Sequence, residues 1–139
     1  MKRVVLDTNV IIAALFWQGP PRLVYDLVRE GQLIMLLTEK MEKEFSRVLG
    51  FSKFGLTSLE IFPFVRELRM KRARVAIRST IKEIITDPAD NIFLECAVDG
   101  NADCIISADK HLLDLSSYCG ILIFRPKEFL VREGYLQDE

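Results

Sequence analysis

Three aspartates occupy positions that a parallel sheet would bring together. Asp7 follows the apolar run 4–6, Asp109 follows the apolar run 104–107, and Asp90 opens a helical pattern. In open parallel sheets, ligands bind outside the carboxyl ends of the strands. Clustered carboxylates repel one another, and a hard divalent cation with oxygen ligands relieves that repulsion. The three residues therefore predict a Mg²⁺ or Mn²⁺ site that could activate water to attack a phosphodiester.

Each aspartate also has a structural interpretation, because Asp at a strand-to-helix junction often caps the helix. In "DPADN", Asp87 and the proline after it are typical of a helix N-terminus. On a helical projection, Asn91, Glu95 and Asp99 form one polar stripe that we expect to face water. Asp90 falls on the apolar face, where an unpaired carboxylate would be costly. We therefore assign Asp87 mainly to starting the helix and Asp90 to the metal.

The segment "TEKMEKEFSRVL" supplies the fourth candidate carboxylate. Met41 and Phe45 belong to its buried stripe, while Glu42 and Glu44 border that stripe on opposite sides. Helix geometry leaves both glutamates open, and a solvated surface role remains the alternative for either.

Short apolar runs alternate with helical periodicities along the whole chain. The predicted strands are 4–6, 33–37, 75–77, 104–107 and 121–124. The predicted helices are 10–16, 20–29, 38–49 with a Thr38 cap, 57–72 with a break or kink at Pro63, 90–99, and a short turn after Asp109. This alternation predicts an α/β fold with a mostly parallel sheet and helices on both faces.

Bulk composition leaves the type of partner open. A chain of 139 residues predicts one domain, and 19 basic against 20 acidic residues argue neither for nor against nucleic acid. No apolar run approaches the roughly 20 residues of a membrane span. Asp7 and Asn9 interrupt the first apolar stretch, so we expect no signal peptide. The three cysteines lack metal-binding spacing and indicate reduced core thiols in a cytoplasmic protein.

Four motifs in the same order and spacing resemble the PIN-domain family. They are "VVLDTNVIIAALF", "TEKMEKEFSRVL", "TDPADNIFLECAVDGNADCIISADKHLL" and "ILIFRPKEFL". The likeness spans residues 4–130, and it is greatest to the prokaryotic subgroup described as toxin components of toxin–antitoxin systems.

The resemblance implies a single domain over residues 1–139. This domain would be a three-layer α/β/α sandwich around a mostly parallel sheet of about five strands. It also implies a Mg²⁺- or Mn²⁺-dependent endoribonuclease acting on RNA, often as a homodimer held inactive by an antitoxin protein. The family's glutamate precedes a Val-Leu pair by four residues, which selects Glu44 over Glu42. The implied acidic set is Asp7, Glu44, Asp90 and Asp109, with Asn9, Asn91 and Ser107 as supporting polar residues.

Two other groups of residues have both a functional and a structural interpretation. His111 could be a general base, although a histidine at a helix start is more often structural. A basic stretch could attract the RNA backbone or could form a solvated helix face. Its candidate RNA-binding residues are Arg66, Arg69, Arg72 and Arg74.

Other functions fit the predicted fold less well. A phosphatase with an aspartyl nucleophile usually has a second Asp two residues later, where this chain has Asn9. A phosphoryl-accepting receiver would need an Asp after strand 75–77, and none follows. A PIN-like RNA-binding or assembly module without turnover remains the main alternative, and the intact acidic set disfavours it.

Overall fold

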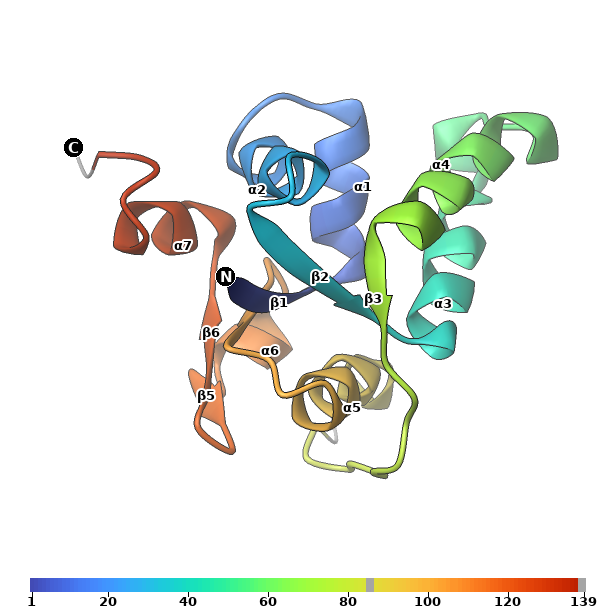
Figure 1. The fold of residues 1–139 in the computed structure, drawn as a ribbon. Coiled ribbons are helices and arrows are strands. Elements are labelled where there is room, and N and C mark those ends of the chain that lie inside the picture. The colour runs from blue at the N-terminus through green and yellow to red at the C-terminus, as the bar shows by residue number, and fades with distance from the viewer. Residues whose placement is uncertain (85–86, 138–139) are drawn as a thin grey trace.

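A six-stranded sheet is the centre of the computed structural model, which describes residues 1–84 and 87–137 (Figure 1). Its strands are β1 (Lys2–Leu6), β2 (Leu33–Leu37), β3 (Arg72–Arg74), β4 (Cys104–Ile106), β5 (Ser117–Tyr118) and β6 (Ile121–Phe124). They lie in the order β3-β2-β1-β4-β6-β5, and only the β5–β6 pair is antiparallel. The predicted α/β class and mostly parallel sheet are confirmed. The sheet has one strand more than expected, because β5 is too short to form a sequence pattern.

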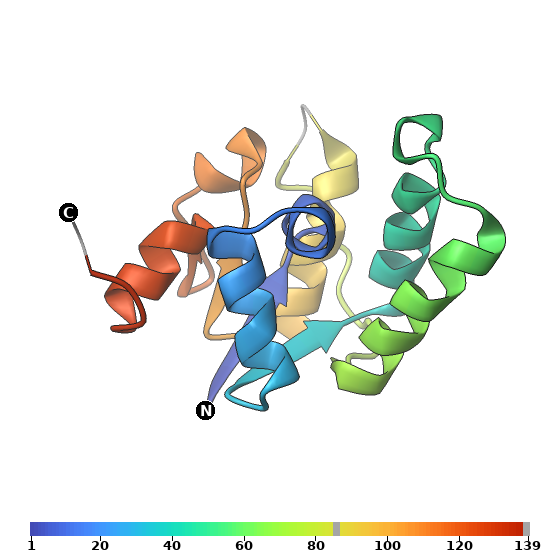
Figure 2. The same cartoon turned by 90° about the horizontal axis from the view of Figure 1, so that it is seen from above.

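Helices cover both faces of this sheet. They are α1 (Thr8–Phe16), α2 (Pro20–Arg29), α3 (Glu39–Leu49), α4 (Ser58–Lys71), α5 (Asn91–Asp99), α6 (Lys110–Leu113) and α7 (Pro126–Arg132), with 3₁₀ turns η1 (Ser52–Phe54) and η2 (Pro88–Asp90). Helices α1, α2 and α7 lie on one face and α5 on the other, while α3 and α4 stand side by side beyond the β2–β3 end of the sheet (Figures 1 and 2). The result is the expected three-layer α/β/α arrangement. No helix in the described ranges has the length and apolar composition needed to cross a membrane.

The order in which strands are added to the sheet changes direction between β1 and β4, which makes this point a topological switch point. It runs from β1 outward through β2 and β3, and then returns to the other side of β1 to build β4 and β6. The backbone amide of Asp7 donates to the carbonyl oxygen of Ile106 at 3.1 Å, which joins the ends of the two strands. Such a switch point leaves a crevice at the carboxyl ends of its strands. Asp7 and Asp109 both follow strands that end there.

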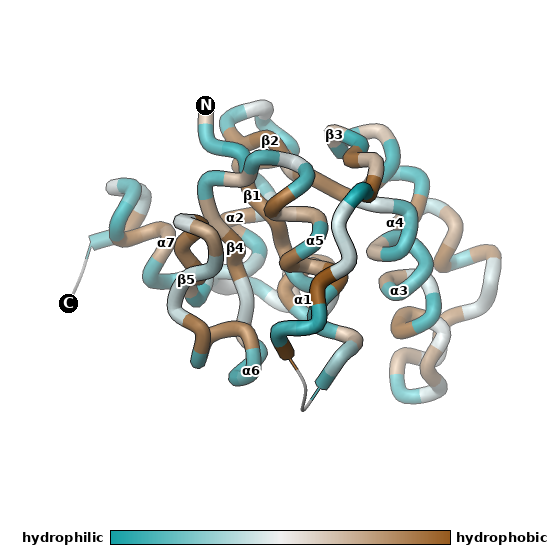
Figure 3. Tube along the Cα trace, turned by 90° about the horizontal axis from the view of Figure 1, so that it is seen from below, coloured by the Kyte–Doolittle hydropathy of each residue, from teal (hydrophilic) through white to brown (hydrophobic). Residues whose placement is uncertain are grey.

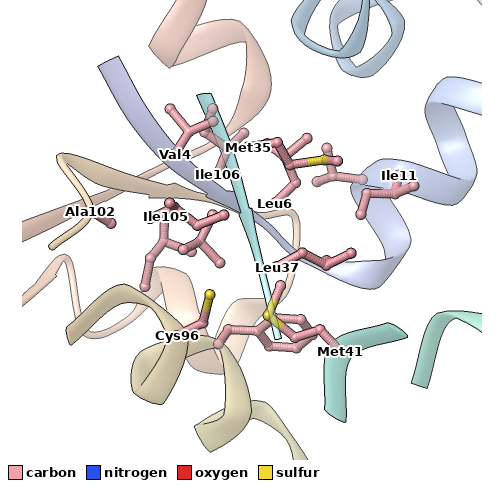
Figure 4. Packing of buried hydrophobic residues seen from close by; sticks show 14 of the residues in the cluster. Val4, Leu6, Ile11, Met35, Leu37, Met41, Cys96, Ala102, Ile105 and Ile106 are labelled. Atoms are coloured by element: carbon pink, nitrogen blue, oxygen red, sulfur yellow. The ribbon is translucent and has the colours of Figure 1, made fainter. Parts of the chain in front are cut away.

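Side chains of the central strands alternate between two apolar layers. Leu6 lies toward Ile11 of α1, and Ile105 points toward Cys96 of α5 (Figure 4). All four are buried, which explains why these strands are apolar without alternation. The hydropathy of the chain follows the same pattern, with hydrophobic segments along the central strands and mixed ones along the outer helices (Figure 3).

The predicted strand at 75–77 is wrong by three residues. Strand β3 is Arg72–Arg74, and its pairing with β2 ends at Leu37 opposite Arg74. Val75 still donates its amide to the carbonyl of Leu37 at 3.0 Å, but β2 extends no further. The apolar pattern missed β3 because this edge strand carries arginines, one of which pairs with a buried glutamate of α3.

A break or kink was predicted at Pro63, and the break is wrong, since α4 is continuous from Ser58 to Lys71. Pro63 lies on an exposed face in the second turn of that helix. The helix start is held by a capping box in which Thr57 and Glu60 satisfy each other's backbone amides.

The polar stripe on α5 does not face water as predicted. The extended segment 78–84 covers it, and every residue of the stripe accepts hydrogen bonds from the backbone of that segment. Asp99 accepts from the amides of Arg78 and Ser79 at 2.7 and 2.9 Å, and Glu95 accepts from Ile81 at 3.0 Å. Asn91 bonds both the amide and the carbonyl of Ile84, at 2.9 and 3.0 Å. The stripe thus fastens the segment that leads to the acidic residues at the start of α5.

Replacing Asp99 by alanine should release the beginning of this segment. The Ser79 hydroxyl and the amides of Arg78 and Ser79 hold the pKa of Asp99 below its usual value, so its charge is present at neutral pH. We expect amide hydrogen exchange at Arg78 and Ser79 to accelerate about 10-fold at pH 7 in Asp99→Ala. Exchange at Ile84, which Asn91 holds, should change little.

Glu83→Ala, an exposed change within the same segment, is the matched control and should leave these exchange rates unchanged. Equal exchange at Arg78 and Ser79 in Asp99→Ala and the parent would show that the stripe does not hold the segment.

Candidate metal centre

Asp7 lies at the end of β1 and caps α1. Its Oδ1 accepts the amide of Val10 at 2.8 Å, and its Oδ2 accepts the Ser107 hydroxyl and the amide of Ala108, the latter at 3.3 Å. Only 3% of the residue is exposed, and this burial raises the pKa of Asp7 against the opposing effect of the Ser107 bond. Capping therefore fixes the carboxylate at the switch point and does not compete with a role in the site.

Asp109 follows β4 and caps the short helix α6. Its Oδ1 accepts the amide of His111 at 2.7 Å, and its own amide donates to the Ser107 hydroxyl oxygen at 2.9 Å. Ser107 thus donates to Asp7 while it accepts from Asp109. A serine at this position links the two strand-end aspartates and fixes their spacing.

Asp90 lies at the junction of η2 and α5 and is only 8% exposed. Its Oδ2 has no hydrogen-bond partner among the described residues. Burial raises the pKa of Asp90 to about 8, and the neighbouring carboxyls of Asp109, Asp87 and Asp7 contribute in the same direction. A buried carboxyl without a partner and with acidic neighbours fits a cation well.

Asp87 does not cap the helix through its side chain, contrary to prediction. It precedes η2, but its carboxylate bonds none of the amides of that turn in the described chain. Only its backbone carbonyl takes part, by accepting the amide of Asp90 at 3.0 Å. The side chain instead lies with its Oδ2 3.8 Å from Nδ1 of His111. Asp87 thus occupies the N-cap position of η2 through its backbone, while its side chain belongs to the acidic group.

The two glutamates of α3 have different surroundings. Glu42 is buried, with its Oε1 2.5 Å from Nη1 of Arg72 and 3.7 Å from Nε of Arg69. Glu44 borders the acidic pocket, where both of its carboxylate oxygens accept from the guanidinium of Arg47 at 2.8 and 3.2 Å. Of the two, only Glu44 has a position from which it can reach the aspartates.

One small cavity of about 60 Å³ brings the four acidic residues together. It is lined by Asp7, Thr8, Asn9, Glu44, Val48, Asp90, Phe93 and Asp109. Asp87, Asp90, Asp109 and His111 also form a group whose nearest ligand atoms all lie within 4.8 Å of one another. The carboxylate oxygens and the unpartnered Asp90 Oδ2 suit a hard divalent cation such as Mg²⁺ or Mn²⁺.

The predicted supporting residues have separate positions. Asn9 is exposed on the wall of the cavity, whereas Asn91, which directly follows Asp90, is buried and bonds the backbone of Ile84. Ser107 links Asp7 to Asp109 as described above.

The sequence interpretation missed Asp87 and Arg47 as neighbours of the site. Arg47 stands three residues after Glu44, which is the helical spacing of an ion pair.

Two of the four candidate RNA-binding arginines lie near an acidic side chain, and the other two are exposed. Arg72 is already paired with Glu42, and Arg69 lies near the same carboxylate. Arg66 and Arg74 are exposed. A role in RNA binding stays a prediction for all four.

A comparison of the sequence with models of protein families tests the family resemblance that the motifs suggested. The family model described as PIN domain matches residues 3–111, which include all of the acidic residues around the cavity. This chain belongs to the PIN-domain family. PIN domains are usually metal-dependent nucleases, and the acidic cluster of this one could bind a metal. A comparison with curated proteins finds no match.

The raised pKa of Asp90 predicts how the stability of the metal-free PIN domain depends on pH. The folded protein holds the Asp90 proton up to about pH 8, whereas the unfolded chain releases it near pH 4. Folded molecules therefore bind more protons than unfolded ones between these values, so stability falls as pH rises from 4 to 8. In Asp90→Asn this fall should be smaller, by an amount on the order of 1–2 kcal/mol after allowance for solvent screening.

Chemical denaturation of both proteins in a chelating buffer between pH 5 and 8 measures the difference. Identical pH profiles would show that Asp90 titrates as an ordinary carboxyl and is not held among like charges.

Proposed function

We propose that this PIN domain is an endoribonuclease that hydrolyses RNA phosphodiester bonds with Mg²⁺ or Mn²⁺. Asp7, Glu44, Asp90 and Asp109 are the proposed metal-binding and catalytic residues. The observation that carries the proposal is the convergence of four carboxylates, from four separate segments of the chain, on one cavity. Membership of a family whose domains generally bind RNA supports the choice of substrate.

In this proposal the bound cation activates a water molecule and stabilises the negative charge that develops on the phosphodiester. The protein contributes the positions of the ligands. Asp7 is fixed by the Val10 amide and the Ser107 hydroxyl, and Asp109 by its bond to the His111 amide. Asp90 offers an oxygen that no described protein group occupies. None of these residues need act as a nucleophile.

Glu44 has a more conditional role in the same mechanism. Each Glu44 oxygen accepts one hydrogen bond from Arg47 and keeps a second lone pair, so the positive charge of Arg47 would compete with a cation that Glu44 bound directly. Binding through a water molecule would leave both hydrogen bonds intact. The Arg47 guanidinium also places a positive charge next to Glu44.

We further propose that the protein is the toxin of a toxin–antitoxin pair in the cytoplasm and that it acts as a homodimer. The resemblance of its motifs to that subgroup supports this role. The exposed side chains of Leu59 and Phe62 on α4 supply apolar surface for a protein partner. A short neighbouring reading frame that encodes a small DNA-binding protein would support the pairing.

The direct test is cleavage of a mixed RNA pool in the presence of Mn²⁺. The parent should cut, and Asp7→Asn and Glu44→Gln should each reduce the rate at least about 100-fold, since each removes a negative ligand from the site. Glu39→Gln is the matched control for Glu44→Gln, because Glu39 lies on the same helix and, among the described residues, pairs only with the exposed Lys43. Its rate should equal that of the parent.

Two results would contradict the proposal. A parent that binds RNA but never cuts it would favour the non-catalytic binding module. A parent whose rate survives Asp7→Asn would mean that the nuclease site lies elsewhere.

A further inference from the structure

Asp87 and His111 lie beside the proposed acidic set without belonging to it. Nδ1 of His111 is 3.5 Å from Oδ1 of Asp109 and 3.8 Å from Oδ2 of both Asp87 and Asp90. The four residues each direct one potential ligand atom into a common space. Asp7 and Glu44, which line the 60 Å³ cavity, are not part of this group.

The spacing of these atoms is close to that of a metal coordination shell. All four ligand atoms lie within 4.8 Å of one another. Around an octahedral ion with bonds of about 2.1 Å, neighbouring ligands are about 3 Å apart and opposite ones about 4.2 Å apart. A contraction of well under 1 Å per side chain would therefore close the shell. Asp87 and His111 have partly exposed side chains that can make this adjustment.

The surroundings of Asp90 supply an independent indication that a ligand belongs here. Its Oδ2 lies 3.8 Å from Nδ1 of His111, it is buried, and no described group donates a hydrogen bond to it. Leaving a carboxylate oxygen desolvated and unbonded is costly, so a cation on this side of Asp90 would stabilise the fold.

The short helix α6 fixes the position of His111. Asp109 caps α6 by accepting the amide of His111, so the two side chains start from the same turn of backbone. A protonated imidazole could also lie here as a simple counter-ion to three carboxylates. The two alternatives differ in one observable respect, which is whether the nitrogen bonds to a metal when metal is present.

We propose that Asp87 and His111 complete a second divalent-metal position, which shares Asp90 and Asp109 with the first and selects Mn²⁺ over Mg²⁺. This inference rests on the proposed function, because the shared carboxylates are those of the nuclease site. The selectivity follows from the nitrogen ligand. Imidazole suits transition-metal ions, whereas Mg²⁺ takes oxygen ligands almost exclusively.

The composition of the chain makes the test unusually direct. His111 is the only histidine among 139 residues, so any imidazole nitrogen that bonds to a metal in tag-free protein must come from it. Electron spin-echo envelope modulation of the Mn²⁺-loaded protein detects such a nitrogen. We expect imidazole ¹⁴N modulation in the parent and none in His111→Gln.

Metal affinities measured by titration calorimetry provide a second reading. His111→Gln should weaken Mn²⁺ binding about 10-fold and change Mg²⁺ binding less than about twofold. Asp87→Asn should weaken the binding of both ions, because it removes an oxygen ligand. Asp114→Asn, an exposed change at the end of the same helix, is the matched control and should bind both ions as the parent does.

Each outcome bears on the second metal position. Mn²⁺ bound without nitrogen modulation, or equal losses of Mn²⁺ and Mg²⁺ affinity in His111→Gln, would overturn this inference and leave the proposed nuclease site intact. A parent that binds no divalent ion would overturn both.

Discussion

Electrostatic repulsion among Asp7, Asp90 and Asp109 is the constraint on which the arrangement of this domain depends. Three carboxylates share one edge of the sheet, and two of them are buried. Burial raises the pKa values of Asp7 and Asp90, and the charge of Asp109 acts on both in the same direction. A folded chain can keep such a group only if other interactions hold the residues in place. Those interactions come from the backbone geometry around the site.

Two sets of contacts hold the group together. At the strand ends, the Val10 amide and the Ser107 hydroxyl donate to Asp7, and the His111 amide donates to Asp109. The Asp109 amide in turn donates to the Ser107 hydroxyl oxygen. On α5, the stripe of Asn91, Glu95 and Asp99 fastens segment 78–84, which precedes Asp87 and Asp90 in the chain. Glu95 also lies 3.9 Å from Lys40, and this contact ties α5 to the helix that carries Glu44. The repulsion is thus balanced by contacts outside the pocket, which leaves the carboxylates available to a cation.

Patterns in the sequence were sufficient to predict much of this architecture. Strands 33–37 and 121–124 and the helix 20–29 were predicted with their observed bounds, because buried parallel strands and amphipathic helices have strong periodicities. Asp7 and Asp109 were predicted at one edge because both directly follow apolar strands. The choice between Glu42 and Glu44 required the family resemblance, since helix phase placed both at the border of the buried stripe.

The errors arose where long-range contacts override local patterns. The polar stripe on α5 looked solvent-facing because a helical projection cannot show that an extended segment will cover it. Strand β3 was missed because it carries arginines, one of which, Arg72, pairs with Glu42, a residue 30 positions earlier in the chain. Asp87 had a complete local explanation as a helix cap, yet its carboxylate lies with His111, which is 24 residues away in the sequence. None of these partners is visible from local spacing.

The most direct test of the account is a crystal structure of the protein grown with Mn²⁺, in which anomalous scattering at the manganese edge locates the ions. The account predicts an anomalous peak within bonding distance of Asp90 and Asp109, with Asp7 beside it and the Ser107 bridge intact. Well-ordered carboxylates with no peak between them, or a manganese ion bound away from Asp90, would contradict it.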